Sequence, residues 1–129
     1  MPTPWVETAR GLSLFTMSDS LDPRVVLVTA PDEVVAERLA RSLVAARLAA
    51  CVNRVPGVVS TYRWEGAVEE GAEVLLIIKT TEQELSALEA AVIAEHPYET
   101  PEFVVLDPGH VSAPYLDWLR ASVGTGGGA

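Results

Sequence analysis

Residues 72–80, Ala-Glu-Val-Leu-Leu-Ile-Ile-Lys-Thr, decide the fold. This run is apolar at odd and even positions alike, a pattern typical of a central strand that is covered on both faces. The valine-rich run at residues 24–30 (RVVLVTA) predicts a second buried strand. The chain therefore builds its core on a sheet, and the segments around these two runs decide what kind of sheet it is.

A third strand region precedes the first run, from residue 50 to residue 65. Pro56-Gly57 interrupts it, and we expect a bulge or bend there because proline cannot donate to a strand ladder. Beyond the interruption the side chains alternate with a period of two. Gly66 and Gly71 then bracket a hairpin region that leads into residues 72–80.

A helix is predicted over residues 32–48, after the first strand. Pro31 suits the first position of a helix, and the acidic residues that follow suit the positive end of its dipole. Apolar residues recur at helical spacing and predict one buried stripe. The stripe is Val35, Leu39, Leu43 and Ala46.

A second helix is predicted over residues 82–96. Thr81 and Glu84 have the spacing of a capping box at its start, and Pro97 ends it. Its expected buried stripe is Leu85, Leu88 and Val92.

A fourth strand at residues 103–106 and a short helix opened by Ser112-Ala113-Pro114 complete the patterned region. The order is strand, helix, strand, strand, helix, strand, with a helix added at the C-terminal end. Right-handed crossovers fold this order into an α+β, ferredoxin-like βαββαβ sandwich, with an antiparallel sheet and both main helices on one face.

That arrangement leaves the opposite face of the sheet bare. Val58, Val59, Tyr62 and Trp64 lie on strands too apolar to remain exposed to water. Apolar sheet surface and long strand edges are typical of association, so we expect an oligomer.

Composition narrows the class of protein. The chain has 129 residues, 49 % hydrophobic, one cysteine and a formal net charge of −9. The acidic balance makes nucleic acid an unsuitable partner, and no run of about 18 apolar residues indicates a membrane span. The N-terminus lacks the pattern of a secretory signal, and we expect a cytoplasmic protein.

The expected domain covers residues 23–123. Residues 1–22 lack a sustained period and are interpreted as a flexible extension, within which Met17 is an alternative start. The glycine-rich residues 124–129 are interpreted as a flexible tail.

A cluster of polar residues precedes the fourth strand. His96 lies among carboxylates at Glu95, Glu99 and Glu102, and a neutral imidazole beside carboxylates can bind a divalent cation. The alternative is structural: two prolines shape a turn whose polar side chains face water. Both interpretations stay open on the residues alone.

From Val25 to Leu119 the chain resembles the CutA divalent-cation-tolerance family. Six strings carry the resemblance in order. They are Thr29-Ala30-Pro31-Asp32, Leu48-Ala49-Ala50-Cys51-Val52, Pro56-Gly57 with Tyr62-Arg63-Trp64-Glu65-Gly66, Lys79-Thr80-Thr81, His96-Pro97-Tyr98-Glu99-Thr100-Pro101-Glu102, and Tyr115-Leu116-Asp117-Trp118-Leu119.

The resemblance implies a ferredoxin-like fold and a homotrimer in which strands of neighbouring subunits extend one another's sheets. It also implies a role in tolerance of divalent metals, copper in particular. Of the proposed family ligands only His96 matches, because Val28 and Glu95 stand where a cysteine and a histidine would be. The expected metal residues are His96, Glu95 and Cys51, and the expected ion is copper or zinc.

The same resemblance implies an alternative, a PII-like signalling trimer with a small ligand in the cleft between subunits. The candidate cleft residues are Lys79, Trp64, Tyr98, Glu99 and Glu102. An enzyme is not expected, since the acidic loop after the first strand does not suit a phosphate-cradling hydrolase, and no organic cofactor is expected either.

Overall fold

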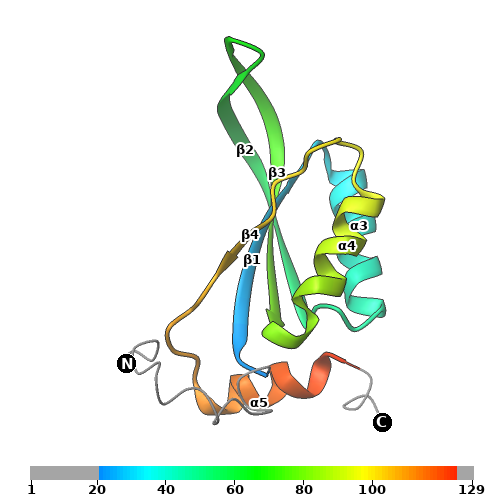
Figure 1. The fold of residues 1–129 in the computed structure, drawn as a ribbon, viewed down its shortest axis with the longest axis vertical. Helices are drawn as coiled ribbons and strands as arrows, with labels where there is room; N and C mark the ends of the chain where they lie inside the picture. Colours follow the sequence, from blue (N-terminus) through cyan, green and yellow to red (C-terminus); the bar gives the residue numbers. More distant parts are fainter. Residues whose placement is uncertain (1–20, 125–129) are drawn as a thin grey trace.

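The computed structural model describes residues 21–124 as one antiparallel sheet, two helices against one face and a third helix at one end (Figure 1). Residues 1–20, Met17 included, and residues 125–129 lie outside the described residues, so the predicted extension and tail stay predictions. Of the predicted tail only Gly124 is described, and its amide donates a hydrogen bond of 2.9 Å to the Arg47 carbonyl oxygen. The elements are β1 (Pro23–Ala30), α3 (Glu33–Ala45), β2 (Cys51–Trp64), β3 (Ala67–Thr81), η1 (Glu82–Glu84), α4 (Leu85–Glu95), β4 (Val104–Leu106) and α5 (Ala113–Ser122).

The strand order is β2-β3-β1-β4, and every pairing is antiparallel. This order confirms the predicted ferredoxin-like sandwich with an added C-terminal helix. The run at residues 72–80 lies in β3, one of the two central strands, as its doubly apolar pattern indicates. In its core-facing half, β3 pairs with β1 from Val74 to Thr81.

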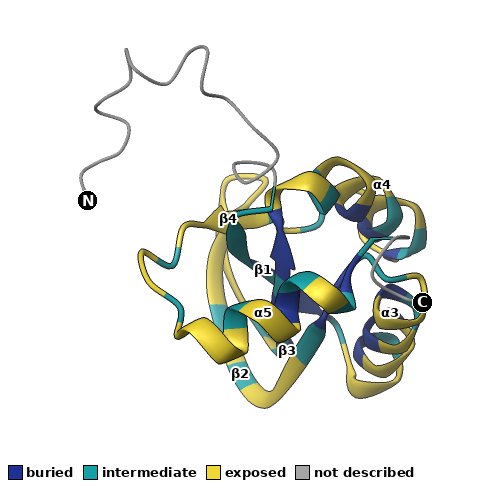
Figure 2. Cartoon of the chain, turned by 90° about the horizontal axis from the view of Figure 1, so that it is seen from below, coloured by how far each residue is buried: buried dark blue, intermediate teal, exposed yellow. Residues whose placement is uncertain are grey.

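The hydrophobic core lies between the sheet and the two helices. Alternate residues of β1 and β3 point into it and meet buried residues of α3 and α4; burial is concentrated there, while β2 remains largely exposed (Figure 2). The fully buried large side chains of the core include Val26, Val28, Leu39, Leu43, Leu76, Ile78, Leu88 and Val92.

The β2–β3 hairpin is longer than the sequence pattern predicted. Trp64 pairs with Ala67, so the turn contains only Glu65 and Gly66, with φ angles of 48° and 83°. Positive φ at both positions is the type I′ geometry that matches the twist of paired strands. Gly71 therefore lies inside β3 and does not end a hairpin loop, and the hairpin projects well beyond the rest of the sheet (Figure 1).

The predicted interruption at Pro56-Gly57 is confirmed. The register of β2 against β3 shifts between Val55 and Val58, which is the mark of a bulge. Gly57 takes a φ of 81°, a conformation that side chains on other residues disfavour.

The first helix is shorter than predicted. Asp32 is its N-cap, where its side chain accepts a hydrogen bond of 2.9 Å from the Val35 amide, and the helix ends at Ala45. Arg47 takes a φ of 62°, which turns the chain towards β2. Ala46 is consequently exposed, and Ala36 and Ala40 join Leu39 and Leu43 in the buried stripe.

The predicted capping box at Thr81 is wrong. The segment opens with the 3-10 turn η1, and the Thr81 side chain makes no capping hydrogen bond. The α-helix begins only at Leu85 and ends at Glu95, one residue before His96. The expected stripe is confirmed by Leu88 and Val92, both fully buried.

The face of the sheet opposite α3 and α4 is open along the hairpin. Tyr62 is 48 % exposed and Trp64 is 56 % exposed. Their cross-strand partners Glu69 and Ala67 lie on the same face as Leu75 and Ile77, which alternate with the buried core residues of β3. The apolar face predicted to be bare is thus present in the described chain.

The hairpin turn offers a matched test of the backbone. Gly66→Ala places an L side chain at a φ of 83° and should lower the free energy of unfolding by about 1–2 kcal/mol. Gly71→Ala should change it little, since Gly71 has no positive φ and an added Cβ would meet nothing within 4 Å. Chemical denaturation of both variants measures the difference, and equal losses would contradict the assigned turn.

Candidate functional site

A cavity of about 800 Å³ lies where the open face of the hairpin meets the loop between α4 and β4. Its walls come from β1, β2, β3 and the loop. The lining residues are Thr29, Ser60, Thr61, Tyr62, Trp64, Glu73, Tyr98, Glu99, Thr100, Pro101 and Glu102.

Strand alternation places one wall of this cavity. Glu73 on β3 pairs with Val58 across the bulge, and Ser60, Tyr62 and Trp64 follow at two-residue intervals on β2. Side chains at this spacing project from the same face of a sheet. The hairpin therefore presents a hydroxyl, two aromatic rings and a carboxylate to one space.

The loop supplies the other wall, and His96 fixes it to the sheet. The Nε2 atom of His96 lies 2.7 Å from the carbonyl oxygen of Thr29, and its Nδ1 accepts a hydrogen bond of 3.1 Å from the Tyr98 amide. Because Nδ1 accepts, the proton belongs on Nε2, which donates to Thr29. His96 is only 7 % exposed, so these bonds hold the start of the loop against the end of β1.

A hydrogen-bonded chain crosses the cavity. The Tyr98 hydroxyl donates to Glu73 at 2.8 Å, and the Ser60 hydroxyl donates to the other oxygen of Glu73 at 2.7 Å. Burial, followed by the hydrogen bond to Glu73, raises the pKa of Tyr98 to about 12. Tyr98 therefore keeps its proton at neutral pH and serves as a fixed donor.

Negative charge gathers at the same place. Burial and then the charge of Glu73 raise the pKa of Glu102 above the usual glutamate range. Glu99 adds a third carboxylate to the wall. Among the described lining residues there is no lysine, arginine or histidine to balance these groups.

The structure brings together four of the five residues predicted for a ligand cleft. Trp64, Tyr98, Glu99 and Glu102 all line the cavity. Lys79 does not: its Nζ atom donates to the side-chain oxygen of Asn53, further along the sheet.

The three residues predicted as metal ligands lie in separate environments. His96 has both ring nitrogens engaged, and Glu95 accepts a hydrogen bond of 3.0 Å from Ser42 on α3. Cys51 pairs with Lys79 on β3, whereas Thr29, the partner of His96, pairs with Leu75. Lys79 and Leu75 are four residues apart, so these two places are separated by about 13 Å along the strand. Within residues 21–124 no group of three His, Cys, Asp or Glu side chains is placed to hold a metal.

Metal binding by this trio stays a prediction, and it would require His96 to give up at least one of its two hydrogen bonds. Cys51 has a different neighbour, Tyr115 on α5. Burial first, and then Cys51, raise the pKa of the Tyr115 hydroxyl. That contact ties the start of β2 to the C-terminal helix.

Glu73 is the charged cavity residue that was not predicted from the sequence pattern. Because the strand was expected to begin at residue 72, Glu73 was placed at its end, and the pattern did not predict on which face of the sheet its side chain lies. The signal that could have found it is the alternation from Glu69 through Glu73, which puts Glu73 on the face of Tyr62 and Trp64 once Gly71 is placed inside the strand.

A family model described as CutA1 divalent ion tolerance protein matches residues 24–122. The chain belongs to the CutA1 family. The match covers every strand and helix described above except Pro23, the first residue of β1.

Relatives in the CutA1 family support the assignment. A divalent-cation tolerance protein CutA from Thermus thermophilus is 51 % identical over 100 residues, covering 78 % of this chain and 97 % of that protein. The solved structure of the T. thermophilus protein has a TM-score of 0.78 at 50 % identity, covering 79 % of this chain and 99 % of that one.

A more distant solved structure comes from Archaeoglobus fulgidus and is described as a periplasmic divalent cation tolerance protein CutA. It has a TM-score of 0.77 at 33 % identity and covers 79 % of this chain and 99 % of that chain.

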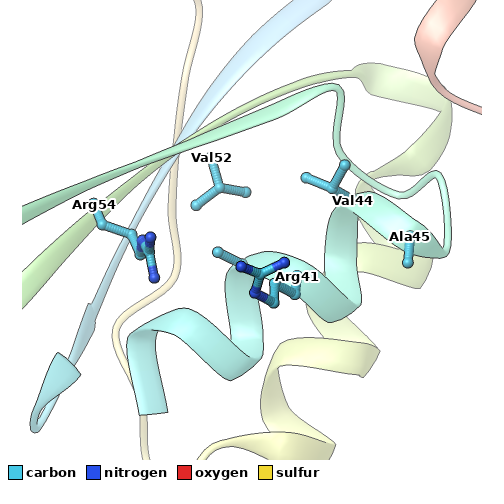
Figure 3. A pocket seen from close by; sticks show the side chains of 6 residues that line it. Arg41, Val44, Ala45, Val52 and Arg54 are labelled. Atoms are coloured by element: carbon cyan, nitrogen blue, oxygen red, sulfur yellow. The ribbon is translucent and has the colours of Figure 1, made fainter. Parts of the chain in front are cut away.

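A second hollow, of about 410 Å³, lies between α3 and β2 (Figure 3). Val44 and Val52 contribute apolar surface, and Arg41 and Arg54 extend over it (Figure 3). Both arginines face Glu37, at 2.9 Å and 3.9 Å, and Arg41 holds the pKa of that carboxyl below its usual range. Glu37 offsets one of the two positive charges, and none of the predicted site residues lines this hollow.

The two histidines allow a matched test of the loop anchor. His96→Ala should lower the free energy of unfolding by about 1–3 kcal/mol, because the Thr29 carbonyl and the Tyr98 amide lose their partner in a buried place. His110→Ala, in an exposed loop, should have little effect. Urea denaturation measures both, and an unchanged stability in His96→Ala would show that the ring does not anchor the loop.

Proposed function

We propose that this chain contributes to divalent-cation tolerance as a homotrimer that binds a divalent cation weakly, without acting as an enzyme. Membership of the CutA1 family supports the tolerance role. The location proposed for the cation is the acidic cavity, with carboxylates of Glu73, Glu99 and Glu102 as the binding groups.

The observation that carries this proposal is the gathering of Glu73, Glu99 and Glu102 around one cavity, with no basic side chain among its described lining residues. The raised pKa of Glu102 agrees with it. A carboxylate that is partly removed from water beside a second carboxylate is held in an unfavourable charged state. A bound cation would relieve this repulsion, so the cavity favours positive charge. Binding would stay weak, because the carboxylates do not converge into a ready group of three.

The type of donor bears on the identity of the ion. The cavity offers carboxylate and hydroxyl oxygens, which suit hard divalent ions such as Mn²⁺ and, less well, Zn²⁺. Cu(I) favours sulfur, and Cys51 is remote from this wall. The binding affinities of copper and zinc, the ions expected from the family resemblance, should therefore be measured beside that of Mn²⁺.

The open face supports the proposed trimer. Leu75 and Ile77 of β3 stay partly exposed on this face, and Val104 and Leu106 of the outer strand β4 are 44 % and 43 % exposed. Within the described chain, β2 and β4 each pair on one side only, so both outer edges are free to pair with another copy.

Light scattering of the dilute protein should give about three times the chain mass of 13.8 kDa. A stable monomer would contradict the assembly.

Cation binding is tested with two variants, each of which removes one negative charge, in the cavity or on the exposed surface. Glu102→Gln should weaken Mn²⁺ binding by about five- to tenfold, since the cavity loses a direct ligand charge. Glu89→Gln removes the same charge from the exposed surface of α4 and should change the affinity by less than about twofold, through screened attraction alone. Isothermal titration calorimetry measures both, and equal effects would place the ion elsewhere.

The pH dependence follows from the sign of the Glu102 shift. Its raised pKa means that Glu102 takes up a proton at a higher pH than an ordinary glutamate, and a protonated carboxyl cannot bind a cation. Mn²⁺ affinity should therefore fall as the pH drops towards and through that raised pKa. In Glu102→Gln the same interval should be flatter, and parallel profiles in both proteins would contradict the role of Glu102.

The PII-like alternative has one observation in its favour, the size of the cavity. A volume of about 800 Å³ is far more than a metal ion needs and lies within the range of small-molecule sites. The carboxylates would repel an anionic metabolite, so any small ligand here must be neutral or positively charged.

We also propose a cytoplasmic location, on the grounds of the single cysteine and the sequence features described above. Within residues 21–124 no helix is long and apolar enough to span a membrane. The A. fulgidus relative is described as periplasmic, so cell fractionation is the appropriate test.

A further inference from the structure

The cavity has aromatic walls as well as acidic ones. Tyr62 and Trp64 project from β2, and Tyr98 lines the same cavity from the loop, near enough to Tyr62 for that residue to contribute to the raised pKa of Tyr98. On the exposed hairpin the rings of Tyr62 and Trp64 are not needed by the core, because the core lies on the other face of the sheet.

Tyr98 is held in place from two sides. Its hydroxyl is bonded to Glu73, and its ring packs against the buried His96 ring with centroids 4.7 Å apart. Both anchors are themselves fixed, Glu73 by Ser60 and His96 by Thr29. The ring therefore forms a preorganised wall, which lowers the entropy cost of ordering it around a ligand.

Inorganic and organic cations make different demands on such a space. A metal ion needs several oxygens converging at 2.0–2.6 Å, roughly the range for hard divalent ions. An alkylammonium ion spreads its charge over methyl or methylene groups and is bound by aromatic faces within about 6 Å, with carboxylates nearby. The large cavity, its aromatic walls and its unconverged carboxylates meet the second set of demands better.

We infer that this cavity binds an organic ammonium ion, with Trp64, Tyr62 and Tyr98 around its alkyl groups and Glu73, Glu99 and Glu102 balancing its charge. The inference shares the acidic cavity with the proposed function but does not require a metal. Its distinguishing feature is dependence on the aromatic rings, which a metal site made of carboxylates would not show.

The experiment uses choline as the probe, its uncharged isostere 3,3-dimethylbutan-1-ol as the control for shape, and MnCl₂ as the inorganic cation. Each is titrated calorimetrically into the full chain in its native assembly. Choline should bind at least about tenfold more tightly than the isostere, because the isostere gains nothing from the carboxylates or from the ring quadrupoles.

The variants separate aromatic from purely acidic binding. Trp64→Leu should weaken choline by about five- to tenfold while leaving Mn²⁺ within about twofold, and Trp64→Phe should recover most of the loss. Light scattering checks that the variants keep the native assembly. If Trp64→Leu alters the assembly, saturation transfer from aromatic protons to the choline methyl protons in the unaltered protein gives the answer.

Equal affinity for choline and its isostere, unchanged choline binding in Trp64→Leu, or no saturation transfer would each overturn the inference. The proposed metal function fails in a different way, by absent Mn²⁺ binding or by Mn²⁺ binding that Glu102→Gln leaves intact. Choline binding without Mn²⁺ binding would therefore support this inference and reject the metal site.

Discussion

The four-stranded sheet carries helices on only one of its two faces, and the rest of the structure depends on this asymmetry. Side chains that alternate along β3 divide between a helix-covered core, where Leu76 and Ile78 are fully buried, and an opposite face on which Leu75 and Ile77 are partly exposed. The helices of the described chain leave the second face uncovered. Apolar surface left open in this way favours association, and it also leaves room for a cavity.

The cavity exists because two segments with different constraints meet on that open face. The hairpin is rigid through its long pairing with a two-residue turn, and the loop before β4 is rigid through His96. A single buried imidazole, by satisfying the Thr29 carbonyl and the Tyr98 amide, sets how far the loop stands from the sheet. His96, which the sequence suggests as a metal ligand, thus determines the shape of the cavity without lining it.

Because His96 is used to hold the loop, the groups that face the cavity are carboxylate and hydroxyl oxygens and aromatic rings. Glu73 holds Tyr98 and Ser60 and contributes charge to Glu102, so one carboxylate links the structure of the cavity to its electrostatics. A cation of either kind would compensate the same excess of negative charge. The two kinds differ in what else they need, either convergent oxygens or aromatic faces.

Much of the fold could be predicted from the sequence, because strand order and helix faces follow from apolar periodicity that is local in the chain. The bulge after Val55 was predictable for the same reason, since Pro56 cannot join a ladder. The capping box at Thr81 failed because the matching spacing of Thr81 and Glu84 does not fix the backbone: a 3-10 turn formed there. Gly71 was misplaced because the true turn required positive φ at Glu65 as well as Gly66.

The candidate site was only partly predictable. The cleft residues of the loop stand together in the sequence, and their clustering was visible. The partner of His96, however, is Thr29, 67 positions away, and a hydrogen bond to a backbone carbonyl leaves no mark on residue type. Glu73 escaped notice because its face depends on a strand boundary that lay several residues earlier than expected.

The most direct test of the central claim is amide hydrogen exchange along the two outer strands, β2 and β4. If other copies of the chain complete the sheet, the amides at these outer edges are hydrogen-bonded in solution, and they should exchange far more slowly than those of the exposed loop around His110. Exchange at the outer edges as fast as in that loop would contradict the account, because it would mean that the open sheet remains uncovered.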